Sequence, residues 1–218
     1  MVQSPSVPQV LYPDSDGQPM GDNTIQYRWM VRLVSNLKRL LKDQLAFVEG
    51  DLLWYPVQVE TPPTPAQAPD VMVVMGRPTV DRGSYKQWEE DNIAPQVVFK
   101  ILSPSNSARE MLIKQAFYGK YGVLEMLFYD PESYDFWGLI RPSADRDFTP
   151  IMAMNFPWTS PTLGIRFELL ETGLEVFYPS GDRFKDPEEV IEERDRLQQE
   201  RDRAFAKLTE LGIDPSEL

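Results

Sequence analysis

Short apolar runs alternate along the chain with polar and proline-rich segments, a pattern that predicts alternating strands and helices. The clearest unit lies within residues 95–131. Here an apolar run at 96–102 predicts a buried strand, residues 110–121 predict an amphipathic helix, and residues 124–129 predict a second buried strand. One charge, Lys100, stands inside the first run. Because an unpaired buried ammonium is strongly disfavoured, Lys100 needs a partner.

An amphipathic helix is also predicted at residues 24–42, with Asp22 or Asn23 as its cap. Its apolar residues recur at helical spacing. They are Trp29, Leu33, Leu37, Leu40 and Leu41. Four cations share the opposite face, within a sector of about 80°. They are Arg28, Arg32, Arg39 and Lys42. The interpretation we favour is an ordinary solvated face, and the alternative is a surface that contacts nucleic-acid phosphates.

The other apolar runs predict more strands. Residues 47–59 are expected to form a hairpin that turns near 49–51, and VMVVM at 71–75 predicts a short buried strand. Asp70 stands at the mouth of that strand, either as a site residue or as a turn cap. Further strands are expected in three segments, which are 134–140, 165–170 and 174–178. Residues 141–164, rich in Pro, Asp and Asn, are expected to be loops.

Three parts of the chain are expected from these patterns. Residues 1–22 contain four prolines and predict an extended arm, residues 23–182 form the main domain, and residues 186–218 carry a long charged helix. That helix bears a thin apolar seam interrupted by Arg194 and Arg201. The seam consists of Val190, Leu197, Ala204, Leu208 and Leu211. Such a seam supports a weak coiled coil or a docking helix, and with it a homodimer.

Composition excludes several kinds of chemistry. The 218 residues include no cysteine and no histidine, which excludes thiolate and histidine metal sites, cysteine nucleophiles and serine–histidine triads. The formal charge is −12, from 34 acidic and 22 basic residues. Nucleic acid repels such a chain at long range, so DNA binding would need a local basic face. With no signal peptide and no apolar run near the roughly 20 residues of a membrane span, a cytoplasmic protein without membrane contact is expected.

An ordered set of short motifs resembles the Uma family of restriction endonucleases, which belongs to the PD-(D/E)XK nuclease superfamily. The set starts with Pro69-Asp70-Val71 before an apolar strand and continues with PQVVFKILSPSN at 95–106. The later members of the set are Lys114, Tyr118, Gly122-Val123, Glu125 and Asp130-Pro131. The resemblance covers about residues 25–180. It implies an α/β restriction-endonuclease-like core, with a central mixed sheet flanked by helices.

The family resemblance also implies a mechanism. Two carboxylates at neighbouring strand ends hold a divalent metal, usually Mg²⁺, and a nearby lysine assists attack by water on a DNA phosphodiester. Asp70 matches the first metal-binding aspartate, and Lys114 matches the family's lysine. The slot of the second carboxylate is occupied by Lys100. Gln96 and Met126-Leu127 depart from the family pattern as well.

A lysine in a metal-ligand position reverses the local charge. We expect Lys100 to pair with Asp70 where a metal would have bridged two acids, which would abolish metal-dependent cleavage. A rearranged site would need another ligand, and the candidates are Glu110, Glu49 and Asp51. Lys114 either faces the site or is a solvated lysine paired with Glu110.

Two functions remain open from the sequence. The first is a Mg²⁺-dependent endonuclease acting on DNA, impaired at Lys100. The second is an inactive nuclease fold that serves as a DNA- or protein-binding module.

Overall fold

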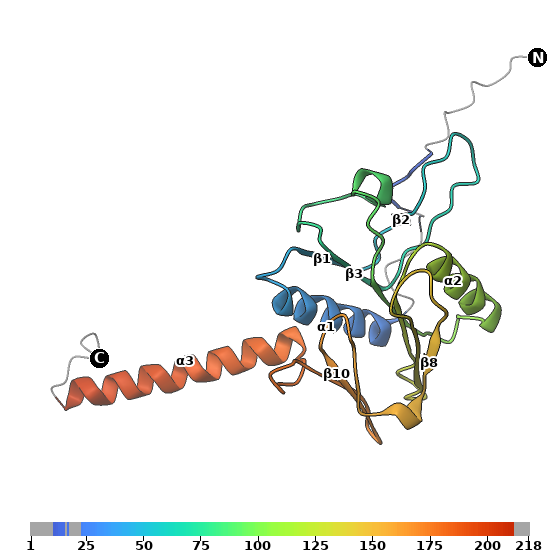
Figure 1. The fold of residues 1–218 in the computed structure, drawn as a ribbon. Helices are drawn as coiled ribbons and strands as arrows, with labels where there is room; N and C mark the ends of the chain where they lie inside the picture. Colours follow the sequence, from blue (N-terminus) through green and yellow to red (C-terminus); the bar gives the residue numbers. More distant parts are fainter. Residues whose placement is uncertain (1–10, 16, 18–22, 212–218) are drawn as a thin grey trace, which may run out of the picture. The chain divides into compact units, whose positions relative to one another are not determined.

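The computed structural model describes residues 11–15, 17 and 23–211, and Figure 1 shows the course of the chain. Its helices are α1 (Thr24–Leu40), α2 (Ala108–Lys120) and α3 (Pro187–Glu210), with 3-10 turns at Gln87–Glu89 and Ala153–Asn155. The chain divides into two compact units, one ending at Phe184 and one beginning at Lys185.

The centre of the first unit is a six-stranded mixed sheet of order β1-β3-β5-β6-β7-β8. Its strands are β1 (Ala46–Glu49), β3 (Val71–Met75), β5 (Val97–Ile101), β6 (Glu125–Tyr129), β7 (Phe136–Ile140) and β8 (Thr149–Ile151). Only β5 and β6 are parallel among these neighbours. A parallel pair needs a crossover connection, and α2 supplies it. The predicted strand–helix–strand unit and the α/β fold class are therefore confirmed.

Two smaller sheets accompany the central one. A three-stranded sheet contains β9 (Trp158–Thr159), β10 (Arg166–Leu170) and β11 (Gly173–Phe177), and a parallel pair contains β2 (Trp54–Tyr55) and β4 (Tyr85–Lys86). Buried side chains form two clusters. One contains residues of α1, the three-stranded sheet and alternate positions of the central strands. The other contains residues of α2, the two-stranded sheet and the intervening positions. Because alternate strand positions face opposite sides, the central sheet has a core on each face.

Helix α1 begins as predicted, since the side chain of Asn23 accepts a hydrogen bond from the backbone N–H of Gln26 at 2.9 Å. The alternative cap, Asp22, lies outside the described residues. The buried face is rotated relative to the prediction, because Trp29 and Leu40 are only half-buried while Met30 is buried. Two polar residues, Gln26 and Asn36, are buried as well. Each finds a hydrogen-bond partner in another element, which apolar spacing does not reveal.

The predicted hairpin at 47–59 is wrong. The chain does turn after β1, where Asp51 adopts a left-handed backbone (φ 51°), but β2 then pairs in parallel with β4 instead of returning along β1. The four residues from Leu52 to Tyr55 are all buried. A hairpin strand with one solvent-exposed face would alternate buried and exposed side chains. The continuous burial of these four residues therefore indicates that the segment is covered on both sides, which the predicted hairpin would not provide.

The loop prediction for residues 141–164 is also partly wrong, since β8, β9 and a 3-10 turn lie there. These elements have three residues or fewer, and segments that short show no periodicity. In the predicted arm, the described part lies against the proline-rich loop that follows β2. The Tyr12 hydroxyl donates to the Val59 carbonyl at 2.7 Å, and Tyr55 donates to the Pro13 carbonyl at 2.6 Å.

An ion cluster fixes the polar connector between β3 and β5. Glu90 accepts hydrogen bonds from Arg82 at 2.6 Å and from Arg77 at 2.8 Å, and all three side chains are less than one-fifth exposed. The Arg82 guanidinium also lies 4.2 Å from the centre of the Phe47 ring. Hydrogen bonds from Arg82, ahead of those from Arg77, hold the pKa of the Glu90 carboxyl below its usual value.

Replacing Glu90 with glutamine is expected to lower the free energy of unfolding by about 2 kcal/mol at pH 7, because it removes charge-assisted hydrogen bonds from two arginines. A carboxyl whose pKa is lowered by folding stabilises above its unfolded pKa and loses that contribution as pH falls through the folded value. Urea unfolding of both proteins should therefore differ at neutral pH, and the difference should shrink as pH falls below about 4.3, the ordinary glutamate pKa, and vanish below the lowered pKa of the folded state. Glu89→Gln is the control, since Glu89 is exposed and lies 3.9 Å from Lys86. An equal difference at pH 7 and pH 3 would contradict the role of the charge.

The second unit contains α3, which begins with a capping box formed by Asp186 and Glu189 and has Pro187 in its first turn. None of its residues is buried. Among the described residues, no helix is long and apolar enough to cross a membrane.

Candidate functional site

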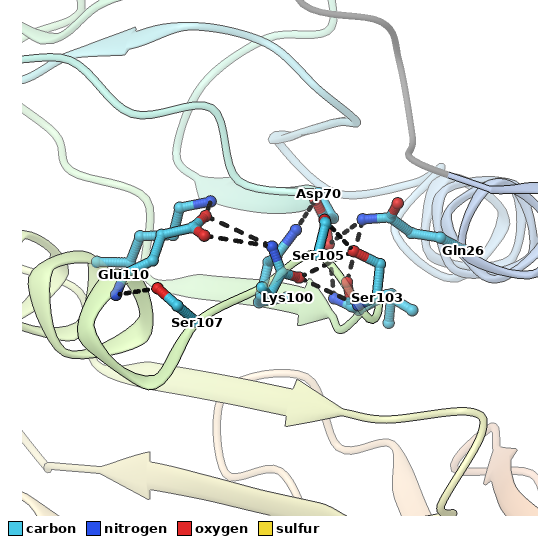
Figure 2. A network of polar contacts seen from close by, with 10 residues as sticks. Gln26, Asp70, Lys100, Ser103, Ser105, Ser107 and Glu110 are labelled. Atoms are coloured by element: carbon cyan, nitrogen blue, oxygen red, sulfur yellow. Dashed lines mark hydrogen bonds and ion pairs between the residues drawn. The ribbon is translucent and has the colours of Figure 1, made fainter.

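The site predicted from the sequence forms at the junction of β3 and β5. These strands run antiparallel with Val71 opposite Phe99, so Asp70 and Lys100 are the next opposing positions. The Lys100 Nζ lies 3.0 Å from the Asp70 Oδ1 (Figure 2), and both side chains are less than one-tenth exposed. The expected ion pair is present. It satisfies the buried ammonium that made Lys100 anomalous in the sequence.

The other oxygen of Asp70 is also engaged. Its Oδ2 accepts a hydrogen bond from the Ile101 backbone N–H at 2.6 Å and a longer one from the Gln26 Nε2 at 3.4 Å. Gln26 projects from α1 and also donates to the Ile101 carbonyl at 3.1 Å. Sequence reasoning missed Gln26. The available signal was a polar residue three positions after the cap, on the side of the helix that carries Met30 and Leu33.

A second ion pair lies in the first turns of α2. Ser107 caps this helix by accepting from the Glu110 N–H at 3.2 Å, and the Glu110 carboxylate contacts the Lys114 Nζ at 2.9 Å. The Asn106 amide lies 3.5 Å from both Glu110 oxygens. The hydrogen bond from Lys114 is the main cause of a lowered Glu110 pKa, and the charge of Lys100 adds to it. Lys114 thus pairs with Glu110, as one of its two interpretations expected.

Tyr118 lies one helical turn beyond Lys114 and is fully buried. Its ring stacks on Trp54 with 6.3 Å between centroids, so Tyr118 is a packing residue. Among the described residues, its hydroxyl has no hydrogen-bond partner. Burial raises the pKa of this hydroxyl, and the charges of Asp70 and Glu110 raise it further, so the phenol stays protonated.

The alternative ligands are each engaged by other groups. Glu49 pairs with Lys38 at 2.9 Å near the surface, and Glu110 is held by Lys114. The backbone of Asp51 donates to the Pro69 carbonyl at 3.1 Å, which fixes the turn before Asp70. No group of three or more acidic side chains that could hold a metal exists within residues 11–15, 17 and 23–211.

These residues do not fit a catalytic divalent cation. Mg²⁺ requires hard oxygen ligands in near-octahedral geometry, usually one or two carboxylates with waters. Here one carboxylate is present, its oxygens are engaged by Lys100, Ile101 and Gln26, and an ammonium stands in the place of the second acid. Among the described residues, Asp70 therefore has no second carboxylate beside it to complete the ligand set of the ordinary metal-dependent reaction.

A separate pocket of about 540 Å³ opens at the carboxyl end of β5, beside the start of α2. Its wall includes Ser103, Asn106, Met111, Asp130 and Trp137, and neither Asp70 nor Lys100 lines it. Parallel strands commonly present ligands at this end of a sheet. The buried ion pair therefore lies apart from this pocket.

The four cations of α1 have separate surroundings. Arg32 lies 4.5 Å from the Trp29 ring centre and Arg39 lies 5.8 Å from that of Tyr178. Arg28 is exposed, and Lys42 makes a long, exposed ion pair with Asp43 at 3.8 Å. The predicted outer face is therefore solvated in part, with two of its arginines resting on aromatic rings.

Comparison with known proteins agrees with the motifs. A model of the Uma2 family, described as "Putative restriction endonuclease", matches residues 17–150, which is more than half of the chain. No curated protein sequence matches. A crystal structure of "a putative nuclease belonging to DUF820" from Anabaena variabilis aligns over 67% of this chain and 77% of that one, with 16% identity and a TM-score of 0.44. The chain belongs to the Uma2 family of nuclease-like proteins.

Proposed function

We propose that this chain is a nuclease-fold domain that binds DNA without cleaving it, because an internal ammonium takes the place of the catalytic metal. The observation that carries the proposal is the buried contact between the Lys100 Nζ and the Asp70 Oδ1 at 3.0 Å. The family description supplies the nuclease relationship. Lys100, in the place of the second metal-binding acid, is the reason for proposing that cleavage is lost.

Electrostatics supports the loss of metal binding. Two unit charges 4 Å apart interact by roughly 4 kcal/mol at an effective dielectric constant of 20, and a divalent cation doubles that repulsion from an ammonium. A metal at Asp70 would also have to displace the hydrogen bonds from Ile101 and Gln26. Water competes poorly for Asp70 because the carboxylate is buried. The ion pair is thus a self-contained substitute for a bound cation.

DNA is the partner that the family implies, and α1 offers the surface. The helix has no acidic residue in its first turn and carries Arg28 as an exposed cation, and exposed Lys42 follows just after its C-cap, Leu41. Because the whole chain has a charge of −12, contact would be confined to this face and would weaken steeply with salt. The double variant Arg28→Glu/Lys42→Glu should bind DNA more weakly than the native chain. Fluorescence anisotropy of labelled DNA at low salt measures the change in affinity.

Metal titration tests the proposal directly. Calorimetry with Mg²⁺ and Mn²⁺ on the full chain is expected to show no saturable site, and purified protein should leave supercoiled plasmid uncut. Asp70→Asn is the matched variant, because it keeps the shape of the side chain while removing the charge. Saturable metal binding and plasmid nicking that both disappear in Asp70→Asn would overturn the loss of cleavage. Uncut plasmid together with no anisotropy change at any salt concentration would overturn DNA binding.

A further inference from the structure

Helix α3 is 24 residues long and has no buried residue. Long helices without a packed face gain little from propensity alone, and most helical stability in proteins comes from burying an amphipathic face. Four of the large apolar side chains on α3 are between 39% and 54% exposed, which are Val190, Ile191, Leu197 and Phe205. Leu211, the C-cap residue, is 71% exposed. A helix of this kind is typical of one that packs against another chain.

The sequence of α3 contains a seven-residue repeat. Glu193-Arg-Asp-Arg196 recurs as Glu200-Arg-Asp-Arg203. In the heptad numbering that this repeat sets, four apolar residues fall at successive d positions, which are Val190, Leu197, Ala204 and Leu211. Leu208 takes an a position, and Ile191 and Phe205 take the adjoining e positions. A strict seven-residue spacing is the period of a left-handed coiled coil.

We propose that α3 pairs with α3 of a second copy of this chain as a parallel, in-register coiled coil. Between Pro187 and Leu208, the a positions carry Arg194 and Arg201, and each is directly preceded by a glutamate at g, Glu193 or Glu200. In a parallel pair, an a side chain packs beside the g residue of the facing helix. Each arginine therefore meets a glutamate of the other copy at both polar layers, and the repeat provides this match twice.

The charge pattern favours the parallel direction. In an antiparallel pair centred on the same seam, g positions face g positions, and the two Glu200 side chains would lie against each other. In the parallel pair, Arg194 and Arg201 each face their own copy at a, and the flanking glutamates at g, Glu193 and Glu200, offset that like charge. The complementarity of Arg201 and Glu200 thus selects the partner and its direction together.

The existing contacts of the arginines do not oppose this pairing. In the single chain, Arg194 contacts Asp195 at 2.7 Å and Arg201 contacts Asp202 at 2.6 Å, and every one of these side chains is at least half exposed. Surface ion pairs of this type contribute about 1 kcal/mol or less. Each arginine can therefore leave its neighbouring aspartate and pair with a glutamate of the second copy at little cost in free energy.

Cysteine crosslinking tests both the partner and its direction, since the chain contains no cysteine of its own. Ala204→Cys at d is expected to form a disulfide-linked dimer on mild oxidation, because the two copies of residue 204 face each other in register. Ala206→Cys is the matched control, the same substitution on the opposite side of the helix, and should stay monomeric. Equal crosslinking of both variants, or crosslinking only when Ala204→Cys is mixed with Arg194→Cys, would overturn the parallel pairing.

Sedimentation equilibrium on the full chain measures the affinity. Leu197→Asp should abolish dimerisation, while Gln199→Asp on the outer face should leave it unchanged. Arg201→Leu should tighten the dimer about tenfold or more, because a polar a position weakens a coiled coil. A chain that remains monomeric throughout the concentration range, with or without Arg201→Leu, would overturn the proposal. The outcome does not depend on whether the site at Lys100 binds metal.

Discussion

Lys100→Glu is expected to create a divalent-cation site at Asp70, where we propose that the native ammonium excludes one. The substitution restores an acid beside Asp70, on the neighbouring strand and at an opposing position. Without metal, two buried carboxylates repel each other, so the variant should be less stable than the native chain. Added Mg²⁺ or Mn²⁺ should recover that stability, since a ligand that binds the folded state at one hundred times its dissociation constant stabilises it by about 2.7 kcal/mol. Thermal unfolding with and without metal measures the effect.

Lys100→Gln is the matched control, because glutamine has the shape of glutamate but adds no charge. It should lose the ion pair and remain insensitive to metal. Metal-dependent nicking of plasmid by Lys100→Glu, absent from Lys100→Gln, would show that one residue separates this chain from a cleaving site. If metal fails to raise the unfolding temperature of Lys100→Glu, position 100 is not the seat of the missing ligand.

Asp70→Ala is expected to lower the free energy of unfolding by about 3–5 kcal/mol, which is the usual result of removing one partner of a buried ion pair. The variant leaves the Lys100 ammonium buried without its carboxylate, and it also leaves the Ile101 N–H without its acceptor. Urea unfolding measures the change.

Two comparisons separate the ion pair from ordinary truncation. The double substitution Asp70→Leu/Lys100→Met should be much less destabilising than Asp70→Ala, because replacing both buried charges by apolar groups is often neutral. Lys114→Met tests the pair with Glu110, in which the Lys114 side chain is 16% exposed and that of Glu110 39%, and should change stability less than Asp70→Ala does. An Asp70→Ala effect no larger than that of Lys114→Met would mean that the Lys100 charge is stabilised by other groups.

The sequence predicted the central unit well for a definite reason. The strands β3, β5 and β6 are mostly apolar runs buried on both faces, with Lys100 and Glu125 as their charged residues, and α2, between β5 and β6, has a serine cap and a glutamate in its first turn. Each signal is local and each agrees with the others. The hairpin at 47–59 failed because strand pairing depends on distant segments, and β2 found its partner about thirty residues away in β4.

The features of the site likewise separate into those that the sequence predicts and those that depend on the tertiary structure. The sequence by itself determined that a lysine stands in a strand where a family acid is expected, that the chain has no histidine or cysteine to replace it, and that its last helix carries a thin apolar seam interrupted by Arg194 and Arg201. Only the tertiary structure decided that Asp70 receives Lys100, Ile101 and Gln26 together. The physical reason is that residue type and spacing record local preference, whereas the satisfaction of a buried charge requires groups from three separate elements to meet.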